Sequence, residues 1–178
     1  DWIPECRSRG RERVLCDRSQ PIDLQDSERD LDRLLERIWH ELTEVLEAQR
    51  SSLFLVDEER DELHSVIAQQ EQEIRFPRTA GISGAVAASG ESLLIADAYQ
   101  DSRFNPEVDR KTGFRTRSIL TVPLKNGAGA VLGVCQVLNR RDGKPFDAQD
   151  QRLAEALAGI SASAIETLQL VAEQKRAT

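Results

Sequence analysis

The sequence is poor in the residues that most often carry chemistry. Among its 178 residues there are two histidines, three cysteines and no methionine. The histidines, His40 and His64, have no metal-ligand spacing with the scattered carboxylates, so we expect no metal site. The cysteines, Cys6, Cys16 and Cys135, are odd in number and form no C-x-x-C pair, which favours reduced thiols. A Cys6–Cys16 disulfide is the alternative.

Long apolar runs are also absent. No stretch approaches the ~20 apolar residues of a membrane-spanning helix, and no signal-peptide pattern opens the chain. We therefore expect a cytoplasmic protein that does not enter a membrane. Hydrophobic residues make up 39% and charged residues 31% of the chain, which is typical of a soluble globular domain. The net charge of −7 disfavours sequence-independent nucleic-acid binding, which normally requires a basic surface.

Catalytic and phosphate-loop motifs are missing. In Gly81-Ile-Ser-Gly84 the second glycine comes one position too early for a nucleophile elbow. The glycines from Gly127 to Gly133 miss the dinucleotide fingerprint by one residue, and they lie where a hairpin turn is expected. No phosphate-loop lysine motif occurs. We therefore expect no catalytic residue, no cofactor and no metal, and hence a protein that is not an enzyme in its own right.

The length favours a single domain. The chain begins with Asp1 and contains no methionine, so we expect it to be a fragment of a longer protein. Residues 1–22 carry five arginines interleaved with acids and two prolines. They are interpreted as an irregular linker or tail, with a basic docking arm as the alternative. Residues 23–178 are expected to form one domain with its core at 51–151.

Two long helices are predicted to flank the core. The first begins after Ser27, which with Asp30 resembles a capping box, and its apolar residues follow helical spacing. These residues are Leu31, Leu34, Leu35, Ile38, Leu42, Val45 and Leu46. The second runs from about 148 to 173, is capped by Asp147, and has apolar residues that approach a heptad seam. These are Leu153, Leu157, Ile160, Ala164, Leu168 and Val171.

The region between the helices is typical of strands. Apolar runs predict strands at 52–57, 63–68, 93–96, 118–124 and 130–138. The last two are joined across Asn126-Gly-Ala-Gly129, a hairpin signal. A short helix is predicted at 84–88 after a glycine-flanked turn, and Asn105-Pro106 starts another. The predicted fold class is α+β: a central antiparallel sheet of about six strands flanked by long N- and C-terminal helices.

Three segments resemble one family. They are Ser52–Asp57, Asp97–Arg117 and Gly133–Asn139. On these residues the stretch from Ser52 to Gln151 resembles the GAF domain family. Within that family it resembles the cyclic-nucleotide-binding subgroup, which includes regulatory domains of mammalian phosphodiesterases and cyanobacterial adenylyl cyclases. The resemblance implies a small-molecule-sensing regulatory domain of a larger signalling protein.

That subgroup carries a scattered signature, Asn-Lys-Phe-Asp-Glu. The matching residues here are Asn139, Arg140, Phe146, Asp150 and Gln151, so two of the five differ. Because arginine keeps the charge of lysine, we predict an ion pair between Arg140 and Asp150 that ties the central strand to the last helix. Gln151 loses a charge. In the family these residues support the pocket more than they contact the ligand.

The resemblance also implies a ligand, cAMP or cGMP, and nine contact positions. They are Ser52, Ile82, Ser83, Phe104, Asn105, Asp109, Thr112, Thr116 and Gln136. Helix starts after Gly81 and at Asn105 offer backbone N–H groups for the phosphate. The Gln136 amide both donates and accepts, so it suits either purine edge. For Asp109 a structural role, bracing the lid over the pocket, is the alternative.

Three functions remain open from the sequence. In the first, a cyclic nucleotide closes a lid at 99–117 and shifts the terminal helices. These helices form a parallel homodimer and relay the change to a C-terminal effector domain. In the second, the same fold binds another small ligand or serves only for dimerisation. The remote third is a methionine sulfoxide reductase-like enzyme, a GAF-fold branch that uses pocket cysteines. Cys135 has no obvious resolving partner for that chemistry.

Overall fold

A computed structural model describes residues 24–68 and 73–177 of the protein. The tail at 1–22, with Cys6 and Cys16, lies outside the described residues. The elements are α1 (Leu24–Val45), β1 (Ala48–Asp57), β2 (Glu62–Ala68), β3 (Arg75–Pro77), α2 (Gly81–Ser89), β4 (Leu93–Ile95), the 3-10 turn η1 (Ala98–Gln100), α3 (Glu107–Thr112), β5 (Ile119–Lys125), β6 (Val131–Arg140) and α4 (Ala148–Ala177).

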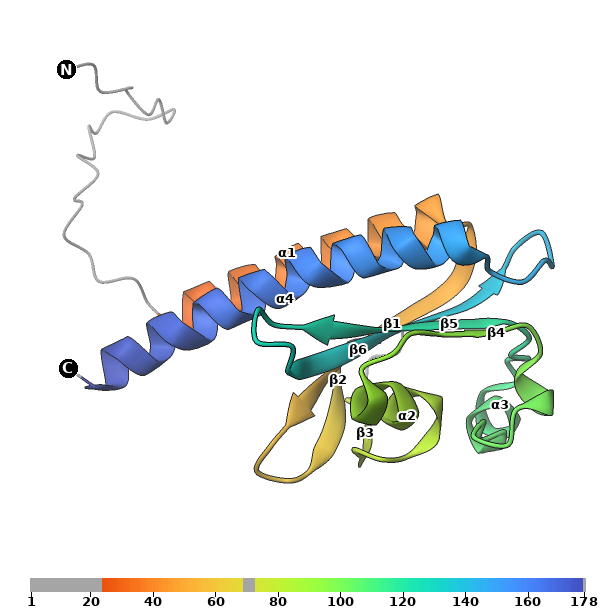
Figure 1. The fold of residues 1–178 in the computed structure, drawn as a ribbon, viewed down its shortest axis with the longest axis horizontal. Coiled ribbons are helices and arrows are strands. Elements are labelled where there is room, and N and C mark those ends of the chain that lie inside the picture. Colours follow the sequence, from red (N-terminus) through yellow and green to blue (C-terminus); the bar gives the residue numbers. More distant parts are fainter. Residues whose placement is uncertain (1–23, 69–72, 178) are drawn as a thin grey trace, which may run out of the picture.

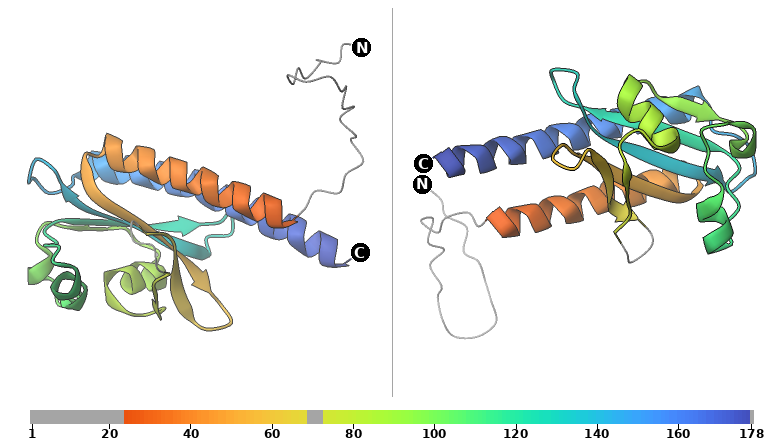
Figure 2. Two further views of the ribbon diagram at one scale, coloured as in Figure 1. Left: turned by 180° about the vertical axis from the view of Figure 1, so that it is seen from behind. Right: turned by 90° about the horizontal axis from the view of Figure 1, so that it is seen from below.

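The strands form one sheet in the order β3-β2-β1-β6-β5-β4, with every neighbouring pair antiparallel. The helices α1 and α4 lie side by side along one face of this sheet, and α2 and α3 lie on the other (Figures 1 and 2). The predicted α+β class and the six-stranded antiparallel sheet are therefore confirmed. The sheet separates a helical layer from the segments that build the site.

The helical layer is held by two different kinds of side chain. From α1, Leu35, Trp39 and Leu42 are buried against the sheet, as the spacing predicted for the two leucines. From α4, the buried residues are mostly small: Ala154, Ala158, Ser161, Ala162 and Ile165. Of the predicted Leu153–Val171 seam, Leu157 packs partly against this core, whereas Leu153 and Ile160 are exposed. Small residues allow α4 to approach the sheet closely, and this leaves the larger apolar side chains on its flank.

The predicted helix starts are correct at α4 and wrong at α1 and α2. Asp147 Oδ1 accepts the N–H groups of Gln149 and Asp150, both at 2.9 Å, so the predicted cap is confirmed. The hydrogen bond from Asp150 N–H, with that from Gln149, lowers the pKa of the Asp147 carboxyl. In contrast, α1 already begins at Leu24, upstream of Ser27. The turn expected at Gly81 is itself the first turn of α2.

All five predicted strands are present, with ends shifted by a few residues. The hairpin between β5 and β6 is confirmed, because Asn126 Oδ1 accepts the N–H groups of Ala128 and Ala130 at 3.0 and 2.9 Å. One strand was missed: β3 has three residues and ends in Pro77. A run this short has no readable alternation, and proline cannot donate to a strand ladder.

Candidate ligand-binding pocket

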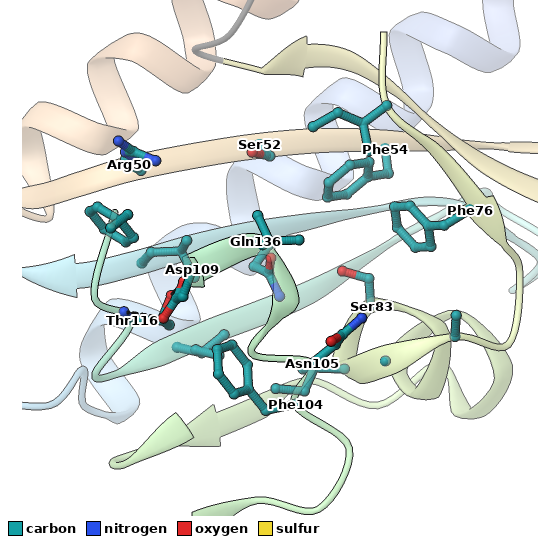
Figure 3. Close-up of a pocket in the computed structure, with 18 of the residues that line it drawn as sticks. Arg50, Ser52, Phe54, Phe76, Ser83, Phe104, Asn105, Asp109, Thr116 and Gln136 are labelled. Carbon is teal, nitrogen blue, oxygen red and sulfur yellow. Dashed lines mark hydrogen bonds between the residues drawn. The ribbon is translucent and has the colours of Figure 1, made fainter. Parts of the chain in front are cut away.

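The sheet face opposite α1 and α4 carries a pocket of about 410 Å³. Its walls come from β1, β3, β6, the start of α2 and the segment 104–116 around α3 (Figure 3). Small-molecule sites typically measure about 300–1,000 Å³, so the volume suits such a ligand. All nine positions that the resemblance assigns to ligand contact line this one pocket. Residues from separate parts of the chain are thus brought together at a single place.

The pocket floor is formed by two central strands. Ser52 on β1 is paired in register with Gln136 on β6. Side chains alternate along a strand, so Arg50 and Phe54 share the Ser52 face and also line the pocket. These two residues were missed. Stepping by two from Ser52 leads to Phe54 within the predicted strand, and it would have led to Arg50 had the strand been extended to its actual start at Ala48.

The start of α2 presents backbone donors to the pocket. Ala80, the N-cap residue, provides no side-chain cap, and Gly81, Ile82 and Ser83 line the pocket. The first N–H groups of a helix lack intrahelical acceptors and carry the positive end of the dipole, which favours an anion. Ser83 is only 5% exposed. Among the described residues no hydrogen bond engages its hydroxyl, and Figure 3 shows it directed into the pocket.

The start of α3 offers fewer free backbone N–H groups than the sequence indicated. Asn105 Oδ1 accepts the N–H of Glu107 at 3.0 Å, so one of the expected phosphate donors is already occupied. Thr112 Oγ donates to the Val108 carbonyl at 2.8 Å, inside α3. Both side chains border the pocket. The uncapped start of α2 is therefore the better anion site of the two.

Asp109 lies at the centre of a hydrogen-bonded group within the lid. It is 7% exposed. Its Oδ2 accepts from the Tyr99 hydroxyl and from Thr116 N–H, and its Oδ1 accepts from the Thr116 hydroxyl, each at 2.8 Å. The hydrogen bond to Asp109 raises the pKa of Tyr99, with burial adding to the effect. Because these bonds use both carboxylate oxygens, the arrangement favours the bracing role of Asp109.

Two cations line the pocket, and they differ in their surroundings. Arg75 is paired with Asp57 at 3.1 Å and with two further carboxylates, so its charge is offset. The Arg50 guanidinium lies 3.9 Å from the centroid of the Phe114 ring. Among the described residues it has no carboxylate within 4.0 Å. Phe114 was also missed. Its contact with Arg50 depends on how the lid folds over β1, which no local pattern indicates.

The apolar wall includes residues on the unpredicted strand. Phe76 of β3 contacts Phe54 of β1 edge-on, with ring centroids 5.0 Å apart. On the lid side Phe104 contacts Tyr99 at 5.1 Å between centroids. Together with Ile82, the rings of Phe54, Phe76 and Phe104 provide an apolar surface beside the polar groups of Ser52, Ser83 and Gln136. For those three side chains no hydrogen bond is found within the described part of the chain.

The signature residues form the support beneath the pocket. The predicted ion pair is confirmed: Arg140 Nη1 lies 3.2 Å from Asp150 Oδ2, with both side chains partly buried. Phe146 is buried in the core between the helices and the sheet. Gln151 Nε2 donates to Glu155 at 2.8 Å, a bond that a glutamate at this position would not make. Of the five side chains, that of Asn139 makes the most hydrogen bonds.

The thiol of Cys135 and the potential metal ligands of the described residues can each be placed in the structure. Cys135 is fully buried, and burial raises the pKa of its thiol well above the usual value. In residues 24–68 and 73–177 no group of three or more histidine, cysteine or acidic side chains is arranged to hold a metal ion. Nor, over that same range, is any helix both long and apolar enough to cross a membrane.

Comparison with known families agrees with the resemblance seen in the sequence and with the observed fold. The family model described as "GAF domain" matches residues 30–165. The chain therefore belongs to the GAF domain family. Its structure is similar to the GAF domain of a phosphoenolpyruvate-protein phosphotransferase from Coxiella burnetii (TM-score 0.71, 21% identity, 84% of this chain and 94% of that one). It is also similar to the free methionine-R-sulfoxide reductase of Neisseria meningitidis (TM-score 0.66, 22% identity, 83% of this chain and 89% of that one). These likenesses establish the fold alone.

Similar curated sequences are parts of phosphodiesterases. The "Probable 3',5'-cyclic phosphodiesterase pde-5" of Caenorhabditis elegans is 36% identical over 142 residues, covering 72% of this chain and 19% of that protein. The "Dual 3',5'-cyclic-AMP and -GMP phosphodiesterase 11A" of Takifugu rubripes is 36% identical over 155 residues, covering 75% of this chain and 17% of that protein. The chain spans less than a fifth of the length of these relatives. It is a GAF regulatory domain homologous to a part of them.

Proposed function

We propose that this domain senses a cyclic nucleotide, cAMP or cGMP, on behalf of a larger signalling protein. The observation that carries the proposal is the convergence of nine positions from separate segments on one pocket of suitable volume. The names of the similar phosphodiesterases add support, because those proteins act on the same nucleotides. We further propose that the domain itself performs no catalysis and acts on an effector domain elsewhere in the protein.

In the proposed complex the phosphate lies at the start of α2. There the N–H groups of Gly81, Ile82 and Ser83 and the Ser83 hydroxyl supply donors without the need for a basic domain. The purine lies against Ile82 and Phe104 with its edge at Gln136. The Ser52 hydroxyl is available to a further polar group. This assignment uses the three polar side chains that are unoccupied in the described structure and leaves Asp109 in its bracing role.

Calorimetry with both nucleotides tests the proposal. We expect one site per chain, and a ligand at 100 times its dissociation constant should stabilise the domain by about 2.7 kcal/mol. Gln136→Ala removes a neutral hydrogen bond and should weaken binding about 2- to 10-fold, whereas Ser83→Ala removes a hydrogen bond to the charged phosphate and should weaken it about 10- to 150-fold. Matched controls are Ser163→Ala and Gln149→Ala on the exposed surface of α4. Absence of both heat and thermal shift at millimolar nucleotide would refute the cyclic-nucleotide proposal.

The alternatives have their own test. Native mass spectrometry of freshly purified protein would reveal a different co-purified small molecule, or an empty dimer if the domain serves only for association. The third alternative, a methionine sulfoxide reductase-like activity, requires a reactive cysteine thiolate. The buried Cys135, with its raised pKa, is poorly suited to that role. Turnover of free methionine sulfoxide by this chain would contradict the non-catalytic proposal directly.

We also propose a parallel homodimer through α1 and α4. Both helices leave large apolar side chains exposed on the layer that faces away from the pocket. They are Leu34 (49%), Val45 (64%), Leu153 (37%), Ile160 (59%) and Leu170 (55%). Burying side chains of this kind contributes roughly 1.5–3 kcal/mol each when burial is complete. A parallel pair would also place both C-termini on the same side, as a relay to effector domains requires.

Light scattering at micromolar concentration tests the dimer. We expect a dimeric mass for the wild-type chain and a monomeric mass for Ile160→Glu, because the charged group cannot be buried unpaired. Gln169→Glu adds the same charge at an exposed polar position on the opposite face of the helix from Ile160, so it is the control and should remain dimeric. A monomeric wild-type chain ends the proposal. So does a dimer in which cross-linking shows the two C-termini pointing in opposite directions.

A further inference from the structure

Asn139, near the end of β6, has an unusual set of hydrogen bonds. It is 1% exposed and has a φ of 54°, a left-handed conformation that asparagine tolerates better than most residues. Its Oδ1 accepts from the N–H groups of Arg117 (2.6 Å) and Ser118 (3.2 Å). Its Nδ2 donates to the Arg115 carbonyl (2.8 Å) and to Gln49 Oε1 (3.1 Å). The full bonding capacity of one amide is thereby used.

Three of these bonds hold the exit of the lid. Residues 115–118, here called the exit segment, lead from the lid into β5. Within this segment Thr116 lines the pocket and is bonded to Asp109 through both its N–H and its hydroxyl. Asn139 bonds the backbone on either side of Thr116. Any displacement of the lid that moves Thr116 must therefore strain or break the bonds of Asn139.

The residues around Asn139 reach both terminal helices. Arg140 is paired with Asp150 in the first turn of α4 at 3.2 Å. Arg141 N–H donates to the Glu47 carbonyl at 2.8 Å, and the Arg141 side chain pairs with Glu44, near the end of α1, at 2.8 Å. Residues 139–141, here called the junction, thus contact the exit segment, the end of α1 and the start of α4.

We infer that Asn139 is a positioning residue that fixes the lid exit to the junction, so that the position of the lid is transmitted to the ends of α1 and α4. This inference deepens the proposed function by naming the route from pocket to helices, and it rests on that proposal only for the identity of the ligand. The competing explanation is that Asn139 does no more than stabilise its own turn. The two explanations differ in how far the effect of removing the amide should extend.

Hydrogen exchange of the ligand-free protein separates these explanations. Asn139→Gly removes the amide while keeping a residue that tolerates positive φ. We expect exchange about 5- to 30-fold faster at 115–118, together with faster exchange at 44–49 and 147–151. The matched control is Asn126→Gly, because Asn126 also accepts two N–H groups but lies at the other end of the β5–β6 hairpin. Its effect should be confined to 126–130. An increase confined to 115–118 in Asn139→Gly would overturn the inference.

A second variant guards against loss of the fold. Gln49→Ala removes only one exposed partner of Asn139, and we expect faster exchange at 44–49 with unchanged exchange at 126–130. No change at 44–49 would contradict the link to α1. Saturating cyclic nucleotide should protect 109–118 and alter 147–151 in the wild type, and only the first in Asn139→Gly. If the nucleotide does not bind, the proposed function fails, while the ligand-free comparison still decides the role of Asn139.

Discussion

Gly84 lies in the first turn of α2, and adding one methyl group there tests how that helix is held beside the pocket. A Cβ at Gly84 would lie 2.3 Å from the carbonyl carbon of Thr79 and 2.7 Å from its oxygen. Non-bonded carbon atoms prefer separations of about 3.5–4.0 Å. The backbone of α2, or of the turn before it, must therefore shift by about 1 Å. A backbone atom cannot rotate aside as the end of a side chain can.

The expected magnitude follows from two opposing terms. Overpacking typically costs about 1–3 kcal/mol, and a backbone contact this short belongs at the upper end. Replacing a helical glycine by alanine offsets about 0.5–1 kcal/mol. We therefore expect Gly84→Ala to lose about 2 kcal/mol of unfolding free energy, a fall in Tm of roughly 4–8 °C for a domain of this size. Because Gly81 and Ser83 belong to the same turn, ligand affinity should fall as well.

Denaturant and thermal unfolding measure the effect directly. The matched control is Gly159→Ala on α4, where an added Cβ has no atom within 4 Å. This substitution should raise stability by about 0.5–1 kcal/mol. If Gly84→Ala is as stable as the wild type, or gains as much as Gly159→Ala, then α2 does not pack against Thr79 as described.

Three further predictions concern Asp150, Asp101 and Cys135. Asp150→Ala should cost about 1–3 kcal/mol in denaturant unfolding, because it removes a helix-start acceptor together with one of the two carboxylate partners of Arg140, leaving only Asp142; a neutral result would contradict both roles. Hydrogen bonds from Arg103 lower the pKa of Asp101 to about 2. A lowered pKa contributes stability that is present above the unfolded value near 4 and lost as the pH falls towards 2. Exchange at 101–104 should therefore be constant from pH 7 to 5 after correction for intrinsic rates and rise below 4, and a rise near pH 6 would be inconsistent. Finally, Cys135 should resist thiol reagents in the native state, as peptide mass spectrometry can show; labelling within minutes at neutral pH would argue against its burial.

The resemblance to the GAF family supplied the polar pocket positions, and local patterns in the sequence predicted five of the six strands. They failed where two patterns coexist on one element. In α4 the stripe of Ala154 and Ala158 runs beside that of Leu153 and Ile160, and periodicity alone does not say which stripe meets the sheet. The closer approach allowed by alanine decides it in the structure. Likewise, the stacking of Arg50 depends on where the lid folds, which is a tertiary property.

The strand order has a consequence for how the chain is made. The local hairpins β1–β2 and β5–β6 can form early, but β1 completes its pairing only with β6. Ala48 pairs with Arg140 and Leu55 with Gly133, partners separated by roughly 80–90 residues. Such non-local pairing slows folding. At about 5–20 residues per second on a ribosome, β1 waits roughly 4–18 s for its partner, with one edge open. The register that sets Ser52 beside Gln136 thus makes the pocket one of the last parts of the protein to form.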